Sequence, residues 1–298
     1  MRTGLPPETR SRPRISGRGA RALLIAVSAL SLAGCGWLPG QTTRLKLDKD
    51  RFEAALDPAV GGPNTCLVLK DTGNGAELYR YGAQSVCNRP LAPCETFRIP
   101  LTVIGLSDGK AVRGQVVKWD GKVQPYKAWE RDMDLEAAWR AGADWWFQRV
   151  AVAVGPDRFK EALSAFDYGQ GRPIGRPDSF WMGPAAGGGL YLSTRNQADI
   201  LRKLARVSLP AKPAAQGTVQ ALMADLIRGQ TELYDLGAQC PSIADASRDV
   251  SWWVGRIKGP DRDLVFALSI ESANPLSGRE IRSRMLPIIT RAGLLPAA

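Results

Sequence analysis

The 298-residue sequence contains no histidine. Histidine supplies the general base of Ser–His–Asp triads and is the commonest metal ligand, so its absence excludes every histidine-dependent triad and most zinc sites. The five cysteines are not spaced like a metal-binding motif either. We therefore expect neither a metal ion nor a cofactor.

The N-terminal apolar run, residues 22–33, is too short to cross a bilayer as a permanent helix. It has about a dozen residues, whereas a spanning helix needs about 20. It follows six arginines, which is typical of a signal peptide. The run ends in Leu32-Ala33-Gly34-Cys35, which resembles a bacterial lipobox; an ordinary secretory signal with an accidental cysteine is the alternative. We predict a lipoprotein signal peptide (1–34), lipidation at Cys35, a tether (35–48) and one folded domain (49–298).

A lipid on Cys35 would make the membrane a partner of this protein. Two or more acyl chains anchor far more firmly than one. Gly36 follows the cysteine, and no aspartate is there to suggest retention in the inner membrane. We expect a protein that faces the periplasm, in the outer membrane rather than the inner one, with peptidoglycan or another envelope protein as a further possible partner.

Part of the net positive charge comes from the predicted signal peptide. The net charge of +11 falls to about +6 without residues 1–34, which contain six arginines and one glutamate. The remaining lysines and arginines are scattered among acids and form no stripe. We therefore expect no nucleic-acid partner.

Four cysteines remain besides Cys35, and an oxidising compartment would allow them to form disulfides. They can pair in three ways. Cys87 and Cys94 are close in sequence and separated by a turn-like segment with two prolines, so we predict that they are bridged. Cys66 lies in an apolar strand and is either paired or part of the core; its relation to Cys240 stays open.

Strand signals lie near both ends of the domain. Residues 65–70 and 76–81 flank a Gly- and Asn-rich turn, and residues 251–258 and 264–270 flank Gly259-Pro260-Asp261, so each pair predicts a β-hairpin. Helical periodicity marks several segments between and after them, at 95–106, across 134–166 with a break at 155–156, and at 198–207, 218–227 and 279–291. This order predicts an α+β fold, with a central antiparallel sheet built from both termini, flanking helices, and a helical lobe inserted at roughly 110–225.

Several segments of the sequence resemble those of a known protein family, most clearly residues 93–100. Residues 93–100, Pro-Cys-Glu-Thr-Phe-Arg-Ile-Pro, resemble the nucleophile segment of the class D β-lactamases, commonly Pro-Ala-Ser-Thr-Phe-Lys-Ile-Pro. Further segments follow in the family's order and approximate spacing, at 118–122, 129–135, 165–169, 180–181, 201–204 and 252–255. The resemblance covers about residues 64–290 and implies the fold shared by β-lactamases and penicillin-binding transpeptidases.

The residues that the family uses for catalysis are replaced here. The family acylates a serine and activates it with a carbamylated lysine, and these positions hold Glu95 and Arg98. A carboxylate is a poor nucleophile toward an amide, and an arginine stays protonated and cannot serve as a general base. The resemblance therefore does not carry the activity with it.

Other motifs of the family have changed as well. Its Ser-x-Val motif corresponds to Gly142-Ala143-Asp144, and its Lys-Thr-Gly motif to the lysine-free stretch 235–238. Its Tyr-Gly-Asn motif survives as Tyr168-Gly169-Gln170. By the same resemblance, Trp181 matches a tryptophan that donates to the carbamate, and Arg279 matches the arginine that binds the substrate carboxylate.

Two hypotheses follow for the old active site. Glu95 and Arg98 can form an ion pair, with Asp144 as a second acceptor, which predicts a structural salt-bridge cluster. Alternatively the acids bind a cationic or amine-bearing ligand, such as a stem-peptide fragment of peptidoglycan, with Glu95, Asp144, Trp181 and Arg279 as candidate contacts. We favour a pseudoenzyme that acts as a binding or scaffolding module; the alternative is a hydrolase, such as a weak β-lactamase, with Glu95 as a general base.

Overall fold

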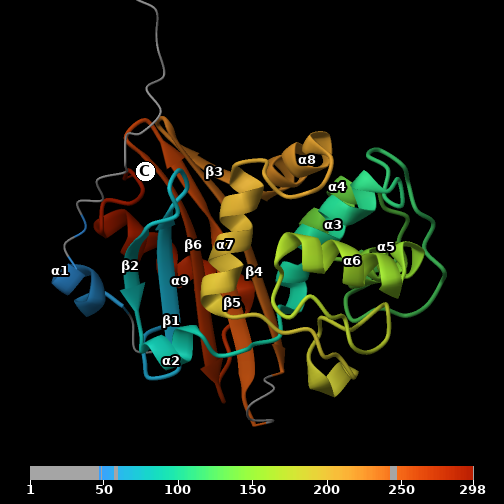
Figure 1. The fold of residues 1–298 in the computed structure, drawn as a ribbon, viewed down its shortest axis with the longest axis horizontal. Coiled ribbons are helices and arrows are strands. Elements are labelled where there is room, and N and C mark those ends of the chain that lie inside the picture. The colour runs from blue at the N-terminus through green and yellow to red at the C-terminus, as the bar shows by residue number, and fades with distance from the viewer. Residues whose placement is uncertain (1–46, 48, 57–59, 242–246, 298) are drawn as a thin grey trace, which may run out of the picture. The chain divides into compact units, whose positions relative to one another are not determined.

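A six-stranded antiparallel sheet lies at the centre of the domain (Figure 1). The structure is a computed structural model and describes residues 47, 49–56, 60–241 and 247–297. The predicted signal segment, Cys35 and most of the tether lie outside these residues. The sheet has the order β2-β1-β6-β5-β4-β3, and its strands are β1 Thr65–Asp71, β2 Glu77–Tyr81, β3 Ala224–Arg228, β4 Thr231–Pro241, β5 Asp249–Gly259 and β6 Arg262–Ser272.

The two ends of the domain meet in the middle of this sheet. β1 pairs with β2, and β5 with β6, which confirms both predicted hairpins. β1 also pairs with β6, where Val68 lies opposite Ala267. Every residue of β1 is buried because the strand has a neighbour on each side and packs on both faces. The predicted α+β fold, with a sheet assembled from both termini, is confirmed.

Each face of the sheet carries its own hydrophobic cluster. On one face, α1 (Lys49–Ala54) and α9 (Gly278–Arg291) pack over side chains such as Trp253. On the other face, α7 (Thr194–Ala205) crosses β1, β5 and β6 and covers side chains such as Trp252. Successive side chains of a strand point to opposite faces, so these two neighbouring tryptophans belong to different clusters.

A helical lobe lies beside the sheet and is built around α3 (Arg98–Ser107), which packs on α5, α6 and α8. All residues of α3 except Leu106 are buried. Pro100 falls in the first turn of α3, as predicted, where a missing N–H is tolerated. The other elements between β2 and β3, apart from α7, are α2 Gln84–Cys87, η1 Cys94–Phe97, η2 Lys127–Trp129, α4 Leu135–Ala141, α5 Asp144–Val154, α6 Pro156–Phe166, η3 Pro184–Ala186 and α8 Pro213–Met223.

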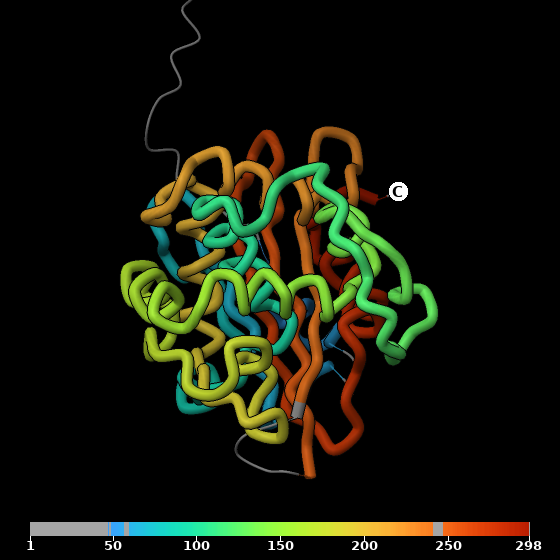
Figure 2. Tube along the Cα trace, turned by 90° about the vertical axis from the view of Figure 1, so that its right-hand side faces the viewer, coloured from blue at the N-terminus to red at the C-terminus, as the bar shows by residue number. Residues whose placement is uncertain are grey.

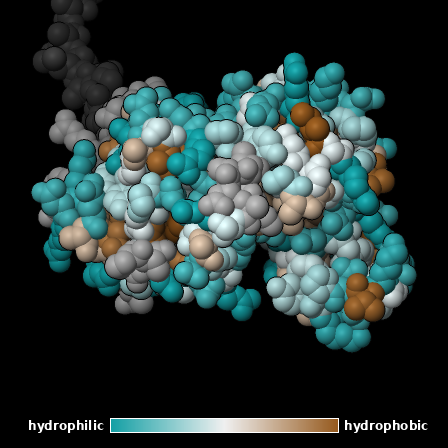
Figure 3. Space-filling model, turned by 90° about the horizontal axis from the view of Figure 1, so that it is seen from below, coloured by the Kyte–Doolittle hydropathy of each residue, from teal (hydrophilic) through white to brown (hydrophobic). Residues whose placement is uncertain are grey.

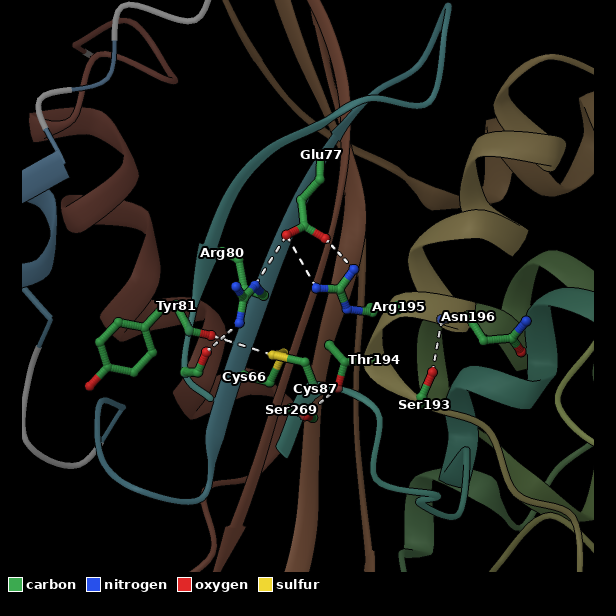
Figure 4. Close-up of a disulfide and its surroundings, with 11 residues drawn as sticks. Cys66, Glu77, Arg80, Tyr81, Cys87, Ser193, Thr194, Arg195, Asn196 and Ser269 are labelled. Carbon is green, nitrogen blue, oxygen red and sulfur yellow. Dashed lines mark hydrogen bonds and ion pairs between the residues drawn. A yellow bond between two sulfur atoms is a disulfide. The ribbon is translucent and has the colours of Figure 1, made fainter. Parts of the chain in front are cut away.

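Two helices differ from their predicted bounds. The helix expected at 198–207 already begins at Thr194, where the Ser193 hydroxyl accepts a hydrogen bond from the Asn196 N–H (Figure 4). The helix expected at 218–227 is wrong in its second half, because α8 ends at Met223 and residues 224–228 form β3. Pairing with β4 supplies the backbone hydrogen bonds of this edge strand and overrides its helical pattern.

The described cysteines form two disulfides, Cys66–Cys87 and Cys94–Cys240, so the predicted bridge between Cys87 and Cys94 is wrong. α2 folds back against β1, which brings the Cα of Cys87 within 5.2 Å of that of Cys66 (Figure 4). Cys94 begins η1 beside β4, and its Cα lies 5.5 Å from that of Cys240. β6 and β5 lie between β1 and β4, so the short segment from Cys87 to Cys94 carries the chain across the sheet and separates these two cysteines.

The surface seen from below is mostly hydrophilic, with hydrophobic side chains dispersed over it (Figure 3). Within residues 47–297, apart from the short gaps in the described chain, no helix is both long and apolar enough to cross a bilayer.

Candidate functional site

Glu95 is held against the end of β4. It is the second residue of η1, and the residue before it, Cys94, is tied to Cys240 of β4 by a disulfide. Its Oε2 lies 2.9 Å from the backbone nitrogen of Gln239, whose N–H donates to it. The disulfide and this hydrogen bond together fix the carboxylate beside the strand.

The surroundings of Glu95 favour its protonated form. Burial raises the pKa of Glu95, although its side chain keeps some contact with solvent. The positive charge of Arg98 opposes this shift, the negative charge of Asp144 adds to it, and the net change is upward. A carboxyl with a raised pKa exchanges its proton closer to neutral pH than an ordinary glutamate does.

Arg98 turns toward the connection between α4 and α5. Its Nη2 donates to Oδ1 of Asp144 at 2.7 Å and to the carbonyl oxygen of Gly142 at 3.0 Å. Its guanidinium carbon lies 5.2 Å from the centre of the Phe147 ring. Arg98 is only 8% exposed, and its buried Nε has no hydrogen-bond partner among the described residues. A buried guanidinium requires a nearby carboxylate, and Asp144 supplies it.

The turn that receives Arg98 is shaped by glycine. Gly142 ends α4 with a φ of +68°, in the left-handed region that glycine adopts without strain. A Cβ at this position would lie 3.2 Å from Nη1 of Arg98. Asp144 is the first residue of α5, where a negative charge is also favoured by the helix dipole. The turn therefore suits a cationic side chain.

The predicted ion pair between Glu95 and Arg98 does not form. Glu95 accepts the Gln239 N–H at β4, whereas Arg98 begins α3 and bonds to Asp144 in the α4–α5 turn. The predicted pairing of Arg98 with Asp144 is confirmed. The expected three-residue cluster is thus two separate contacts, one at β4 and one in the lobe.

An aromatic cluster packs beneath η1. The centre of the Phe97 ring lies 5.2 Å from that of Trp181, 5.1 Å from that of Phe180 and 5.8 Å from that of Tyr168, and all four residues are buried. Trp181, a predicted ligand contact, therefore forms part of the core, and its carbonyl accepts the N–H of Cys94 at 3.1 Å. Burial raises the pKa of the Tyr168 phenol.

The lysine-free stretch 235–238 lies on β4, next to η1. Ala238 belongs to the cluster on the η1 face, and Leu236 packs against it. Asp235 points to the opposite face, where its carboxylate lies 2.8 Å from Nε of Arg282 in α9. The side of this strand that faces η1 therefore presents apolar side chains and no cation at these positions.

Two predicted site residues, Gln170 and Arg279, form no hydrogen bond or ion pair with Glu95 in the described part of the chain. Gln170 is exposed and lines a pocket along α6 together with residues 157, 160, 161, 164, 171 and 172. Arg279 is exposed in the first turn of α9, which packs on the other face of the sheet. The arginine of α9 that reaches β4 is Arg282, which the sequence reasoning missed. The acid at Asp235, in a strand next to apolar residues, was the signal that a cation had to lie nearby.

The thiol and the hydroxyl on either side of Glu95 in the sequence are both occupied. Cys94 is in a disulfide, and the Thr96 hydroxyl is buried and donates to the Pro93 carbonyl at 2.5 Å. The N–H of Gln239 is the kind of donor that acyl-transfer enzymes aim at a developing oxyanion, but it is bonded to the carboxylate of Glu95. The arrangement holds the Glu95 and Arg98 charges in fixed contacts.

Comparison with known proteins identifies the family. The sequence model of the penicillin-binding protein transpeptidase domain matches residues 65–287. The chain belongs to this family. Within this penicillin-binding transpeptidase family it is class D β-lactamase-like. It is 31% identical over 205 residues to β-lactamase OXA-5 of Pseudomonas aeruginosa, covering 68% of this chain and 75% of that protein. It is 33% identical over 189 residues to OXA-10 of the same organism, covering 61% and 67%.

Solved structures share the fold. A class D β-lactamase from Bacillus subtilis superposes with a TM-score of 0.69 at 25% identity and covers 87% of this chain and 100% of its own. The C-terminal domain of the BlaR penicillin receptor of Bacillus licheniformis superposes with a TM-score of 0.72 at 21% identity and covers 82% and 96%. This class D-like fold is thus found in a β-lactamase and in a receptor domain.

Proposed function

We propose that this protein is an exported lipoprotein whose class D β-lactamase-like domain has lost serine acyl transfer and serves as a binding or scaffolding module. The observation that carries the proposal is the contact between Arg98 and Asp144 at 2.7 Å, next to a Glu95 carboxylate bonded to β4. Acyl transfer requires an activated nucleophile. These positions offer a fixed carboxylate and a paired guanidinium instead.

The same contacts favour a structural role over binding of a cationic ligand. An amine would have to compete with Arg98 for Asp144 and with the Gln239 N–H for Glu95. The two pockets along α6 are lined by neither acid. The carboxylates of Asp144 and Glu95 already have partners within the protein, which supports a scaffold.

Export and anchoring form the second part of the proposal. Cys35 is the proposed lipidation site, in the outer membrane and facing the periplasm, with peptidoglycan or another envelope protein as the partner. The two disulfides of the domain support export, because disulfides persist in oxidising compartments. Palmitate labelling of the wild type and of Cys35→Ser tests the anchor. Label should enter only the wild type, and equal labelling of both would refute lipidation at this cysteine.

A second candidate function is hydrolysis with Glu95 as the general base. Burial raises the pKa of Glu95, which favours this function, because a general base works best with a pKa near the operating pH. The hydrogen bond from the Gln239 N–H opposes it, because the bond already uses one oxygen of the carboxylate.

Hydrolysis of a chromogenic cephalosporin separates the two candidates. We expect no turnover by the wild type above that of the Glu95→Gln variant. Turnover that is present in the wild type and lost in Glu95→Gln would establish the hydrolase. Asp261→Asn, a change of an exposed acid at a turn, is the matched control and should leave any turnover unchanged.

Reversion gives a harder test of the same proposal. Restoring the family's serine and lysine with Glu95→Ser and Arg98→Lys should not restore hydrolysis, because Gly142 and the apolar side of β4 still lack the family's other polar groups. Hydrolysis by this double variant would mean that those positions matter less than we propose.

A further inference from the structure

The connection between α3 and α4 is a long loop at the outer edge of the helical lobe. We name residues 112–131 the lobe loop; it is drawn in green at the right-hand side of Figure 1 and also lies at the edge of the molecule in Figure 2. Its base is fixed, because Val117 pairs with Met133 and the buried Trp129 donates from its indole to the Ala141 carbonyl at 2.9 Å. The lobe loop is therefore anchored to the rest of the lobe at its base.

Exposed apolar side chains gather on the lobe loop. Val123 is 88% exposed and Tyr126 63%, and Val112 and Val116 are about half exposed. These four are half of the eight large hydrophobic residues that are exposed in the described part of the chain. Single scattered apolar residues are normal on a protein surface, whereas four of them belong to this one loop.

Charge on the lobe loop is arranged with the cations outward. In its ion pairs the lysine side chain is the exposed member and the acid is the recessed one, with exposures of 90% and 8% for Lys127–Glu130, 84% and 40% for Lys118–Asp132, and 80% and 33% for Lys122–Asp120. The lobe loop therefore presents ammonium groups to its surroundings, and the lysine is the more exposed partner in each of these pairs.

Several ion pairs elsewhere in the domain have the opposite arrangement. The acid is the more exposed partner in three such pairs, Lys203–Asp167, Arg262–Asp261 and Arg282–Asp225. Outward cations are thus not general to the ion pairs of this domain, although Arg176–Asp178, with exposures of 78% and 27%, shares the arrangement of the lobe loop.

We propose that the lobe loop docks on the surface of an anionic lipid bilayer. Lysines near an anionic surface are attracted to it, and apolar and tyrosine side chains enter the interface between headgroups and acyl chains. Val123 and Tyr126 lie between Lys122 and Lys127 in the sequence, so apolar and cationic side chains are mixed, whereas a protein interface gathers its apolar residues into one core. The proposal rests on the proposed function only in that a lipid on Cys35 brings the domain to a bilayer.

A fluorophore on the lobe loop tests this contact directly. The full chain with Val123→Cys carries an environment-sensitive label and is mixed with vesicles of phosphatidylethanolamine, with or without phosphatidylglycerol. The matched control is the label at Ile227→Cys on β3, which is 70% exposed, and the parent chain without an added cysteine reports any label on Cys35. Flotation of the vesicles measures anchoring separately.

We expect a blue-shifted emission at position 123 with phosphatidylglycerol vesicles only, and none at position 227. Removing three lysine charges by changing Lys118, Lys122 and Lys127 to Gln should lower the ratio of lipid-contacting to free label roughly 100-fold, at about tenfold per 1.4 kcal/mol and about 1 kcal/mol per lysine. The same changes at the exposed residues Lys160, Lys212 and Lys258 should have little effect.

Several results would overturn the proposal. One is an unshifted emission at position 123 with anionic vesicles, whether or not the chain floats. Equal shifts at positions 123 and 227 would show that the contact is not specific to the lobe loop. A shift produced by peptidoglycan fragments and not by vesicles would assign the lobe loop to the wall polymer.

Discussion

Removing the carboxylate of Asp144 should destabilise the domain substantially. The side chain of Arg98 is 10% exposed and that of Asp144 28%, and their charged atoms lie 2.7 Å apart. Breaking a buried pair by removing one partner costs about 3–5 kcal/mol, because the other charge stays buried without compensation. Arg98 would keep the Gly142 carbonyl and the Phe147 ring. For Asp144→Ala we therefore expect about 3 kcal/mol, the lower end of that range.

Urea unfolding followed by tryptophan fluorescence, with the disulfides intact, measures this loss. Adding Arg98→Met to Asp144→Ala removes both charges and should recover part of the stability, which gives a coupling energy by the double-mutant cycle. Asp261→Ala is the control, because its carboxylate is 68% exposed and such pairs contribute about 1 kcal/mol or less. A loss for Asp144→Ala no larger than that of the control, with no coupling to Arg98, would refute a structural role for this ion pair.

Three further predictions concern the same region. Because burial raises the pKa of Glu95 above its ordinary value of 4.5, the folded protein keeps a proton that the unfolded chain releases, so stability should fall as pH rises from 4.5 to the folded pKa. Urea titrations below pH 4.5 and above the folded pKa measure this fall, and Glu95→Gln should remove it. The same dependence of unfolding free energy on pH in the wild type and in Glu95→Gln would contradict the shift. Gly142→Ala, at a left-handed φ and with a Cβ 3.2 Å from Arg98, should cost about 1–2 kcal/mol, measured as a lower Tm; an unchanged Tm would show that the turn tolerates a side chain. Replacing both Cys94 and Cys240, which are 146 residues apart, by serine should cost about 5 kcal/mol of loop entropy in denaturant unfolding, and a loss below 1 kcal/mol would show that the unfolded chain is not restrained by this bridge.

Features that depend on neighbouring residues could be predicted from the sequence. The turn at 71–75 and the turn at 259–261 each join two strands, because their residues favour tight turns wherever they occur. Pro100 in the first turn of α3 follows from the chemistry of proline alone. The break between α5 and α6 at Gly155-Pro156 is local in the same way.

Features that depend on contacts between distant segments could not be predicted from the sequence. The cysteine pairs follow from which strand each cysteine reaches, and closeness in sequence misled for Cys87 and Cys94. The family resemblance predicted the contact between Arg98 and Asp144. Nothing in the sequence indicated that Glu95 would accept the Gln239 N–H. The choice between Arg279 and Arg282 depends on which side chain of α9 is directed at Asp235, and Arg282 is the one that reaches it.

The intact mass of the protein after incubation with a penicillin shows whether the chain still forms an acyl-enzyme. We predict no added mass on the wild-type chain, because neither Glu95 nor Cys94 nor Thr96 is available as a nucleophile. A class D β-lactamase that has the serine, treated alongside, should gain the mass of the penicillin. A stable penicilloyl adduct on the wild-type chain would contradict the loss of acyl transfer.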